Sequence, residues 1–253
     1  MNAPILVTGG TGRLGRFVVD RLVDAGQDVR VLARHEGGAE SRVKFFVGDL
    51  LRNEGIDPAV RGVGVIVNCA TSTRGDARTT TNLVNAAMRA DSPHIVQPSI
   101  VGIDAMSQWG YVKTKLLVER IIQTSGLPWT ILRSTQFYNY CSENSRRLAR
   151  FPIFAPVPGG FRVQPVDSRD VAARLVELAL GTPAGRVPDI SGPEVSSWED
   201  LFRSYLVATH QRKVVVPVPV PGGKAVRGGA LLPPPDHTEG ARTWEQFLAE
   251  DLS

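Results

Sequence analysis

The chain has 253 residues, of which 42% are hydrophobic and 21% are charged, and its formal net charge is +4. These values are ordinary for a globular protein, and the length suits one large α/β domain or a domain with a small appendage. Lysine and arginine form no dense block, so we expect no nucleic-acid partner. The two cysteines have no metal-ligand spacing, and no apolar run reaches membrane-span length. We therefore expect no metal site, no membrane partner and a cytoplasmic location.

The first element is a short apolar run over residues 5–7, which predicts a buried parallel strand. Three glycines follow at three-residue spacing, and an amphipathic helix pattern begins at Leu14. In such a strand–turn–helix, Gly9 allows the tight turn, Gly12 lets the backbone approach a phosphate, and Gly15 lets the helix pack closely. The helix N-terminus then faces the anion, so the segment predicts a dinucleotide site. A turn that only connects strand and helix explains one glycine more easily than three.

Strand and helix patterns alternate through the rest of the first half. This alternation predicts a Rossmann-type α/β fold with a doubly wound parallel sheet. After Arg133 the elements are short and separated by proline and glycine. We predict a dinucleotide-binding domain over 1–133 and a smaller C-terminal substrate-side portion over 134–253, integrated with the same sheet. The expected strands are 29–33, 43–47, 63–67, 95–101 and 129–132, and the expected helices are 79–90 and 111–124.

Three signals mark the second portion. Asp170 is expected to cap a helix over residues 171–180. Ser196 and Glu199 have capping-box spacing ahead of another helix. The alternating valines and prolines of residues 214–221 predict an extended edge or linker, and not a central strand.

Three side chains carry candidate chemistry. Tyr111 and Lys115 are four residues apart, so they share one face of the predicted helix over 111–124. A lysine ammonium beside a phenol stabilises the phenolate, which makes Tyr111 a candidate general acid or base. Ser99 lies near the end of a predicted strand, where its hydroxyl would polarise a substrate carbonyl. A tyrosine and a lysine at this spacing, and a serine at a strand end, also occur by chance. The glycine turn upstream is what favours one common site for the three side chains.

Arg34 bears on the choice of cofactor. It stands at the end of the second predicted strand, where an acidic residue would bind the adenosine 2′-hydroxyl of NAD. A guanidinium suits a 2′-phosphate instead, so NADP(H) is favoured over NAD(H). A solvated surface arginine is the plain alternative.

Together these motifs resemble the short-chain dehydrogenase/reductase superfamily in its extended or atypical branch. They are most similar to its NmrA-like NAD(P)H-binding proteins. The resemblance covers most of the chain and weakens after about residue 195. It is carried by residues 8–15, 31–34, 48–50, 99–102, the Tyr111–Lys115 pair and residues 127–137.

The resemblance implies that Ser99, Tyr111 and Lys115 form a catalytic triad. Tyr111 would pass a proton to the substrate oxygen, and Lys115 would also hold the nicotinamide ribose. Asp49 and Leu50 would flank the adenine, although a turn cap is the plain alternative for Asp49. The cofactor-binding positions implied in all are Gly9, Thr11, Gly12, Arg13, Leu14, Gly15, Arg34, Asp49, Leu50, Cys69, Ala70, Thr71 and Lys115.

We therefore expect an NADPH-dependent oxidoreductase that transfers hydride to a small carbonyl or quinone-like substrate. The alternative is a non-catalytic NADP(H)-binding redox sensor of the NmrA-like type, because members of that group often keep the cofactor site and lose turnover. A sugar-nucleotide epimerase or dehydratase would need a diphosphate site, for which the chain offers only Arg133, Arg162 and Arg169. The expected partner is a small-molecule substrate, and both monomer and homodimer stay open.

Overall fold

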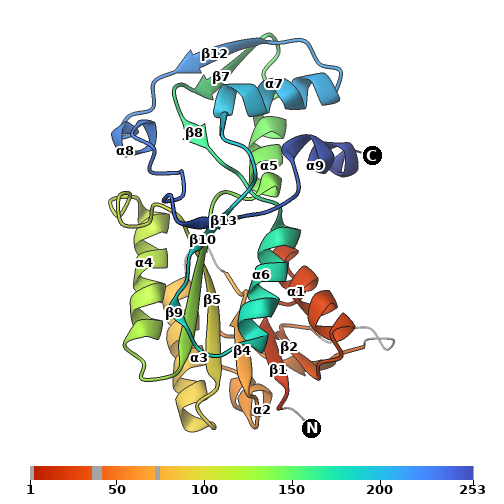
Figure 1. Cartoon of the computed structure of the whole chain (residues 1–253), viewed down its shortest axis with the longest axis vertical. Helices are drawn as coiled ribbons and strands as arrows, with labels where there is room; N and C mark the ends of the chain where they lie inside the picture. The colour runs from red at the N-terminus through yellow and green to blue at the C-terminus, as the bar shows by residue number, and fades with distance from the viewer. Residues whose placement is uncertain (1–2, 36–41, 72–74, 253) are drawn as a thin grey trace. The chain divides into compact units, whose positions relative to one another are not determined.

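The computed structural model describes residues 3–35, 42–71 and 75–252 (Figure 1). The chain divides into two compact units, each assembled from separate stretches of sequence. The first unit comprises Met1–Ser99, Ser107–Leu132 and Ala172–Val187. The second comprises Ile100–Met106, Arg133–Val171 and Pro188–Ser253.

The first unit is built on a parallel sheet in the order β3-β2-β1-β4-β5-β6, with β9 also paired to β6. This is the strand order of doubly wound dinucleotide-binding sheets, so the predicted Rossmann-type fold class is confirmed. The strands are β1 (Ile5–Thr8), β2 (Val29–Ala33), β3 (Lys44–Val47), β4 (Val65–Asn68), β5 (His94–Ile100), β6 (Trp129–Ser134) and β9 (Gly185–Arg186).

Helices supply the rest of the core of the first unit. Leu6, Ile66 and Ile95 from three neighbouring strands pack with Leu83 and Ile122 from two helices, and all five are at most 1% exposed. Burying side chains of this size supplies the main driving force for the fold. The helices are α1 (Arg13–Asp24), α2 (Ile56–Val60), α3 (Asp76–Arg89), α4 (Gly110–Gln123) and α6 (Ser168–Leu180), the last of which begins in the second unit.

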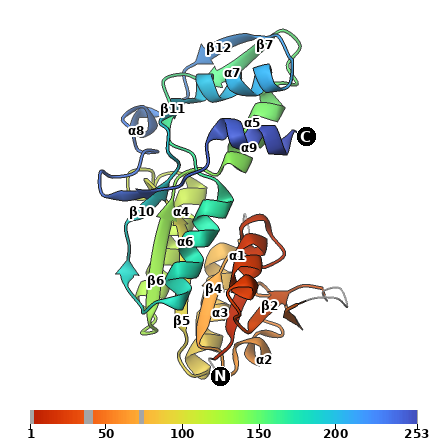
Figure 2. The same cartoon turned by 45° about the vertical axis from the view of Figure 1, so that its right-hand side comes forward.

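The second unit consists of short elements (Figures 1 and 2). β10 (Asp189–Ser191) pairs in parallel with Ser134 and with β13 (His237–Glu239). β7 (Phe154–Pro158) pairs in parallel with β12 (Val214–Val218), and β8 (Arg162–Val163) pairs antiparallel with β11 (Ser196–Ser197). The helices are α5 (Tyr138–Leu148), α7 (Trp198–Ala208), α8 (Lys224–Arg227) and α9 (Trp244–Asp251). None of the helices in the described ranges is long and apolar enough to cross a membrane.

Two predicted helix caps are wrong, one by three residues and the other by one. Asp170 lies within the first turn of α6, and the carboxylate of Asp167, just before the helix, accepts the backbone N–H of Arg169 at 2.8 Å. Ser197 caps α7 in place of Ser196, and its hydroxyl accepts a first-turn N–H. In both segments neighbouring residues are equally good caps, so tertiary packing decides which one is used.

Asp167 is the centre of a charged network in the second unit. Its side chain is buried and accepts hydrogen bonds from Arg169 Nη2 at 2.8 Å and Arg242 Nε at 3.0 Å. Both arginines also pair with Glu250 of α9. Burial alone would raise the pKa of Asp167, but the hydrogen bonds and charge of Arg169, together with Arg242, hold this pKa below its usual value.

We predict that Asp167→Asn lowers the free energy of unfolding at pH 7 by about 3 kcal/mol. This is the lower end of the range for broken buried pairs, because both arginines are partly exposed. Since the folded-state pKa of Asp167 is depressed, its contribution is present above pH ~4 and is lost as the pH falls through the folded pKa. Urea denaturation at pH 7 and pH 3 should show a smaller pH effect in the variant.

The matched control is Glu250→Gln, at the exposed end of the same network. It should change the unfolding midpoint much less than Asp167→Asn does. Equal midpoints for the parent and Asp167→Asn at pH 7 would contradict the role of the buried carboxylate.

Candidate cofactor and catalytic site

The glycine turn joins β1 to α1, and its three glycines have different surroundings. Gly9 has φ +63°, and a Cβ there would lie 2.7 Å from the backbone nitrogen of Ala70. A Cβ on Gly15 would collide with the carbonyl oxygen of Gly9. A Cβ on Gly12 would meet just one atom of the described residues within 4 Å, the same oxygen at 3.1 Å. The fold therefore requires glycine at positions 9 and 15, whereas glycine at position 12 mainly leaves space open beside the start of α1.

The N-terminus of α1 begins at that space. Gly12 is the N-cap and gives the helix no side-chain hydrogen bond, and the first turn carries no acidic residue. Thr11 and Arg13 are exposed and Leu14 is half-buried. First-turn N–H groups and the positive end of the helix dipole favour an anion. Space and donors together fit the pyrophosphate of a dinucleotide.

A buried chain of hydrogen bonds fixes the strand ends beside the turn. Thr8 Oγ1 donates to Asn68 Oδ1 at 2.6 Å, and Asn68 Nδ2 donates to Gln97 Oε1 at 2.7 Å. The backbone N–H of Ala70 donates to Thr8 Oγ1 at 3.2 Å. These bonds link β1, β4 and β5 and hold the exit of β4 against Gly9, so the predicted cofactor positions 69–71 lie beside the glycine turn.

The cysteines are not poised for chemistry. Burial raises the pKa of the Cys69 thiol to about 12 and shifts that of Cys141 in the same direction. A neutral thiol is a poor nucleophile and a poor metal ligand. Among residues 3–35, 42–71 and 75–252, no group of three or more histidine, cysteine, aspartate or glutamate side chains is arranged to hold a metal ion.

Lys115 connects several of the predicted site residues. It lies in α4, is 7% exposed, and its Nζ lies 2.6 Å from Asp76 Oδ2 and 3.3 Å from Thr71 Oγ1. Thr71 Oγ1 itself donates to Asp76 Oδ2 at 3.1 Å. The ring centroid of Tyr111 lies 5.7 Å from the same Nζ, and Tyr111 is 52% exposed. The structure thus brings Lys115, Tyr111 and Thr71 together.

Sequence reasoning missed Asp76. The predicted helix began at residue 79, whereas α3 begins at Asp76 and places this carboxylate in its first turn. An acidic residue at a helix start is a common and unspecific signal, and its partner Lys115 lies on the next helix. Because Coulomb attraction falls with distance, the ammonium is compensated by Asp76 more strongly than it acts on the ring of Tyr111. Lys115 is therefore best suited to act as a fixed hydrogen-bond donor.

Ser99 and Arg34 occupy the strand ends where they were expected. Ser99 is 6% exposed in β5, two residues after Gln97 and so on the same face of the strand. Arg34 is exposed directly after β2 and forms no hydrogen bond or ion pair with any residue that the structure describes.

Asp49 and Leu50 are occupied by the protein itself. The carboxylate of Asp49 accepts the backbone N–H groups of Leu51 at 2.7 Å and Arg52 at 3.2 Å, which is the turn-capping alternative. The side chain of Leu50 belongs to the hydrophobic core, and its carbonyl accepts a hydrogen bond from Asn82. A role in adenine binding stays a prediction for both residues.

The arginines that a sugar-nucleotide diphosphate would need are mostly engaged elsewhere. Arg133 is 5% exposed and its Nη1 lies 2.7 Å from Asp104 Oδ2. Arg169 belongs to the network of Asp167. Arg162 is exposed on β8. This arrangement favours a reductase-type site over an epimerase site.

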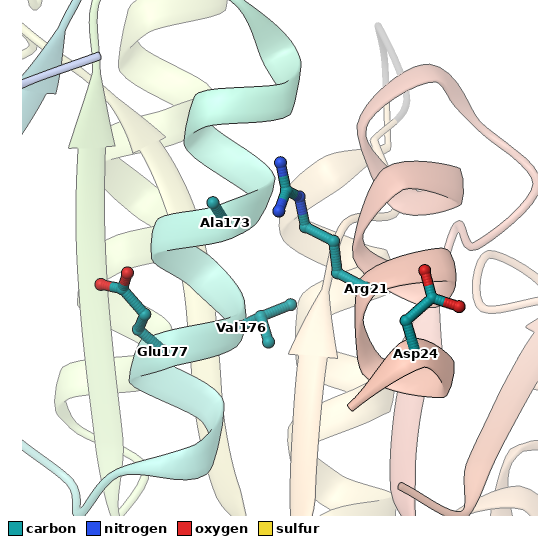
Figure 3. A pocket seen from close by; sticks show the side chains of 5 residues that line it. All are labelled: Arg21, Asp24, Ala173, Val176 and Glu177. Atoms are coloured by element: carbon teal, nitrogen blue, oxygen red, sulfur yellow. The ribbon is translucent and has the colours of Figure 1, made fainter. Parts of the chain in front are cut away.

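A separate cavity of about 300 Å³ lies between α1 and α6 in the first unit (Figure 3). Arg21 points into the gap, opposite Ala173 and Val176, whereas Asp24 and Glu177 point away from it. One cation against apolar walls offers no set of converging catalytic groups. The cavity contains none of the predicted site residues.

Comparison with known proteins shows the family to which this chain belongs. A family described as NAD(P)H-binding matches residues 9–180, and the chain belongs to this family. The match confirms the superfamily that the motifs indicated.

The individual relatives include a reductase and an assembly factor. The chain is 32% identical over 197 residues to (4-alkanoyl-5-oxo-2,5-dihydrofuran-3-yl)methyl phosphate reductase of Streptomyces griseus, covering 75% of this chain and 68% of that protein. It is 31% identical over 150 residues to the photosystem II assembly factor Ycf39 of Trieres chinensis, covering 53% of this chain. The aligned region spans 46%, or about half, of that relative.

A solved structure of similar fold is the NADPH-dependent quinone oxidoreductase of Escherichia coli in complex with NADPH. Its TM-score is 0.82 at 17% identity, with 98% of this chain and 100% of that chain covered. At this level of identity the likeness shows the fold alone.

We predict that Lys115→Met lowers the free energy of unfolding by about 3–5 kcal/mol, because it removes the cation that compensates a buried carboxylate. Tyr111→Phe, on the same helix but half exposed, should change it by no more than about 0.5 kcal/mol. The double variant Asp76→Leu/Lys115→Met should recover most of the loss, since both charges of the pair are removed. Equilibrium denaturation measures all three, and a Lys115→Met protein as stable as Tyr111→Phe would refute the ion pair's role.

Proposed function

We propose that the protein is an NADPH-dependent oxidoreductase that reduces a small carbonyl or quinone-like substrate. The observation that carries the proposal is the buried Lys115 beside the exposed ring of Tyr111, in the unit that contains the glycine turn. Membership of the NAD(P)H-binding family and the similarity to a reductase from Streptomyces griseus support it.

The residues present fit such a cofactor. The space at Gly12 and the N-terminus of α1 would take the pyrophosphate, and Arg34 would take the adenosine 2′-phosphate. Lys115 and Thr71 would hold ribose hydroxyls, because both offer hydrogen-bonding groups at fixed positions. A bound nicotinamide would supply the hydride.

The side chains of this chain would handle the proton and the substrate oxygen. The hydroxyl of Tyr111 would donate a proton to that oxygen, and its exposure would let water restore the proton afterwards. The hydroxyl of Ser99 would orient the carbonyl. Asp76 would act through Lys115, by holding the ammonium in place. Asp76 is thus a positioning residue in this scheme.

We predict that the protein binds NADPH at least about tenfold more tightly than NADH, since a charge-assisted contact from Arg34 contributes about 1.5–3 kcal/mol. Arg34→Ala should remove most of this preference, and Arg61→Ala, at another exposed arginine of the first unit, should leave it unchanged. Fluorescence titration with both cofactors measures the ratio. A preference that survives in Arg34→Ala would show that another group selects the cofactor.

We predict that Tyr111→Phe binds NADPH nearly as well as the parent but reduces an accepted carbonyl about 10²–10⁴-fold more slowly. The ring and its packing survive, and only the acid is lost. Tyr140→Phe, at an equally exposed tyrosine of the second unit, is the matched control and should keep full turnover. Unchanged turnover in Tyr111→Phe would mean hydride transfer without acid catalysis by tyrosine, as a quinone permits.

The second candidate is a non-catalytic redox sensor that binds NADP(H). It is favoured by one property of the site, the compensation of Lys115 by Asp76, which weakens the effect of the ammonium on Tyr111. The similarity to a photosystem II assembly factor also points to a non-catalytic role. Tight NADPH binding with no NADPH consumption across a broad panel of carbonyls and quinones would favour the sensor over the enzyme.

A further inference from the structure

The ribbon of β7 and β12 in the second unit has one face that is entirely apolar. Alternate residues on its other face, Ala155 and Val157, are fully buried, and this side lies against α7 (Figures 1 and 2). Register and alternation place the remaining residues on the outer side. This outer side, the ribbon face, consists of Phe154, Pro156, Pro158, Val214, Val216 and Val218.

Phe154, Val214 and Val216 of the ribbon face are exposed, whereas its other three residues are half-buried, and the apolar surface continues beyond the strands. Phe154 is 60% exposed and Val214, its register partner, is 52% exposed. Phe151 and Ile153, just before β7, are 46% and 60% exposed. Exposed apolar side chains grouped in this way mark an interaction surface, whereas single ones do not.

The segments that build the ribbon are strongly biased in charge. Residues 144–166 and 201–235 contain no aspartate or glutamate. Acidic residues are common in the rest of the chain, so these two segments have an excess of positive charge, of which Arg146 pairs with Asp251 and Arg203 with Asp200. Their cations are Arg146, Arg147, Arg150, Arg162, Arg203, Arg212, Lys213, Lys224 and Arg227.

Cations lie directly at the edge of the apolar surface. Lys213 Nζ donates to the backbone carbonyl oxygen of Phe151 at 2.8 Å, which places the ammonium at the backbone of an exposed apolar residue. Arg212 immediately precedes Lys213, and Arg150 immediately precedes Phe151. These three cations form no ion pair with any of the described residues, so their charge is available to an anionic partner.

The chemistry of this surface argues against two kinds of protein partner. A second copy of the chain would bring like charges together around the apolar faces. An added β-strand would need backbone N–H groups along the ribbon edges, but Pro156, Pro158 and Pro217 remove donors from both strands. The ribbon face also offers no polar side chain that would specify a protein partner.

We propose that the ribbon face binds the surface of an anionic lipid bilayer. Phe151, Ile153 and Phe154 enter the interfacial region, where apolar side chains are buried without a defined partner. Arg150, Arg212 and Lys213 contact lipid phosphates. Such a contact needs no spanning helix, and the expectation of no membrane partner rested on span length alone. It would place the protein where apolar substrates accumulate.

The test is co-sedimentation of the full-length protein with vesicles of phosphatidylglycerol and phosphatidylcholine, compared with vesicles of phosphatidylcholine alone. We expect binding to the anionic vesicles that weakens with salt, and little binding to the neutral ones. Phe151→Ser/Phe154→Ser should weaken binding by about tenfold or more, since buried aromatic area is lost. Arg212→Gln/Lys213→Gln should weaken it by about 30-fold, as about fivefold is expected for each cation.

Matched controls use exposed residues of the first unit. Met88→Ser removes an exposed apolar side chain, and Arg61→Gln/Arg120→Gln removes two exposed charges, so neither should change vesicle binding. Phe151 and Phe154 are exposed, and unchanged NADPH affinity in each variant verifies that the protein is folded. Absence of vesicle binding by the parent, or equal binding by the phenylalanine variant, would overturn the proposal. Dimerisation abolished by the same variant without vesicle binding would assign the face to a second copy.

Discussion

The close approach of α1 to β1 is the constraint on which the candidate site depends. Gly15 lies against the carbonyl of Gly9, and any side chain at position 15 would push the helix away from the strand. The approach directs the N-terminus of α1 at the space over Gly12. It also brings the turn against Ala70 at the exit of β4. The positive end of the helix dipole and the open space therefore coincide at one point of the first unit.

A second constraint acts on the residues proposed to be catalytic. Lys115 is buried, and a buried ammonium is stable only with a compensating charge, which Asp76 provides. This ion pair joins α3 to α4 and includes Thr71 at the exit of β4. Because the ammonium is fixed there, it is available to a ribose in a defined position. The same compensation limits how far Lys115 can activate Tyr111. The enzyme hypothesis requires that enough of this activation remains for catalysis, whereas the sensor hypothesis does not.

The sequence predicted the elements whose structure depends mainly on neighbouring residues, such as the buried strands and the glycine turn. Buried parallel strands are short apolar runs, and β2 was predicted with the bounds that it has. The glycine turn was recognised because each glycine answers a separate steric need. In contrast, α5 was not predicted, since its sequence is mostly polar and only Tyr138, Cys141, Ser142 and Ser145 are buried. Its burial depends on contacts made by distant parts of the second unit, such as the hydrogen bond from Tyr138 to Arg242.

Long-range pairing explains the remaining differences at the site. Nothing near Asp76 in the sequence indicates that its carboxylate meets Lys115. The turn-capping role of Asp49 is a local one, and the sequence offered it as an alternative. The valines and prolines of β12 indicated an extended edge, which the pairing with β7 confirms. The outer residues of β12 form one apolar face with Phe154 of β7. This arrangement follows only from the register of the two strands, which are far apart in sequence.

The most direct test of the cofactor site is amide hydrogen exchange in the presence and absence of NADPH, in the parent and in Gly12→Val. The φ of −83° at Gly12 is accessible to valine, so the variant should fold, but its side chain would occupy the space for the pyrophosphate. NADPH should slow exchange at residues 11–15 and 69–71 in the parent and leave them unchanged in the variant. The same protection in both proteins, or none in the parent, would contradict a pyrophosphate site at the glycine turn.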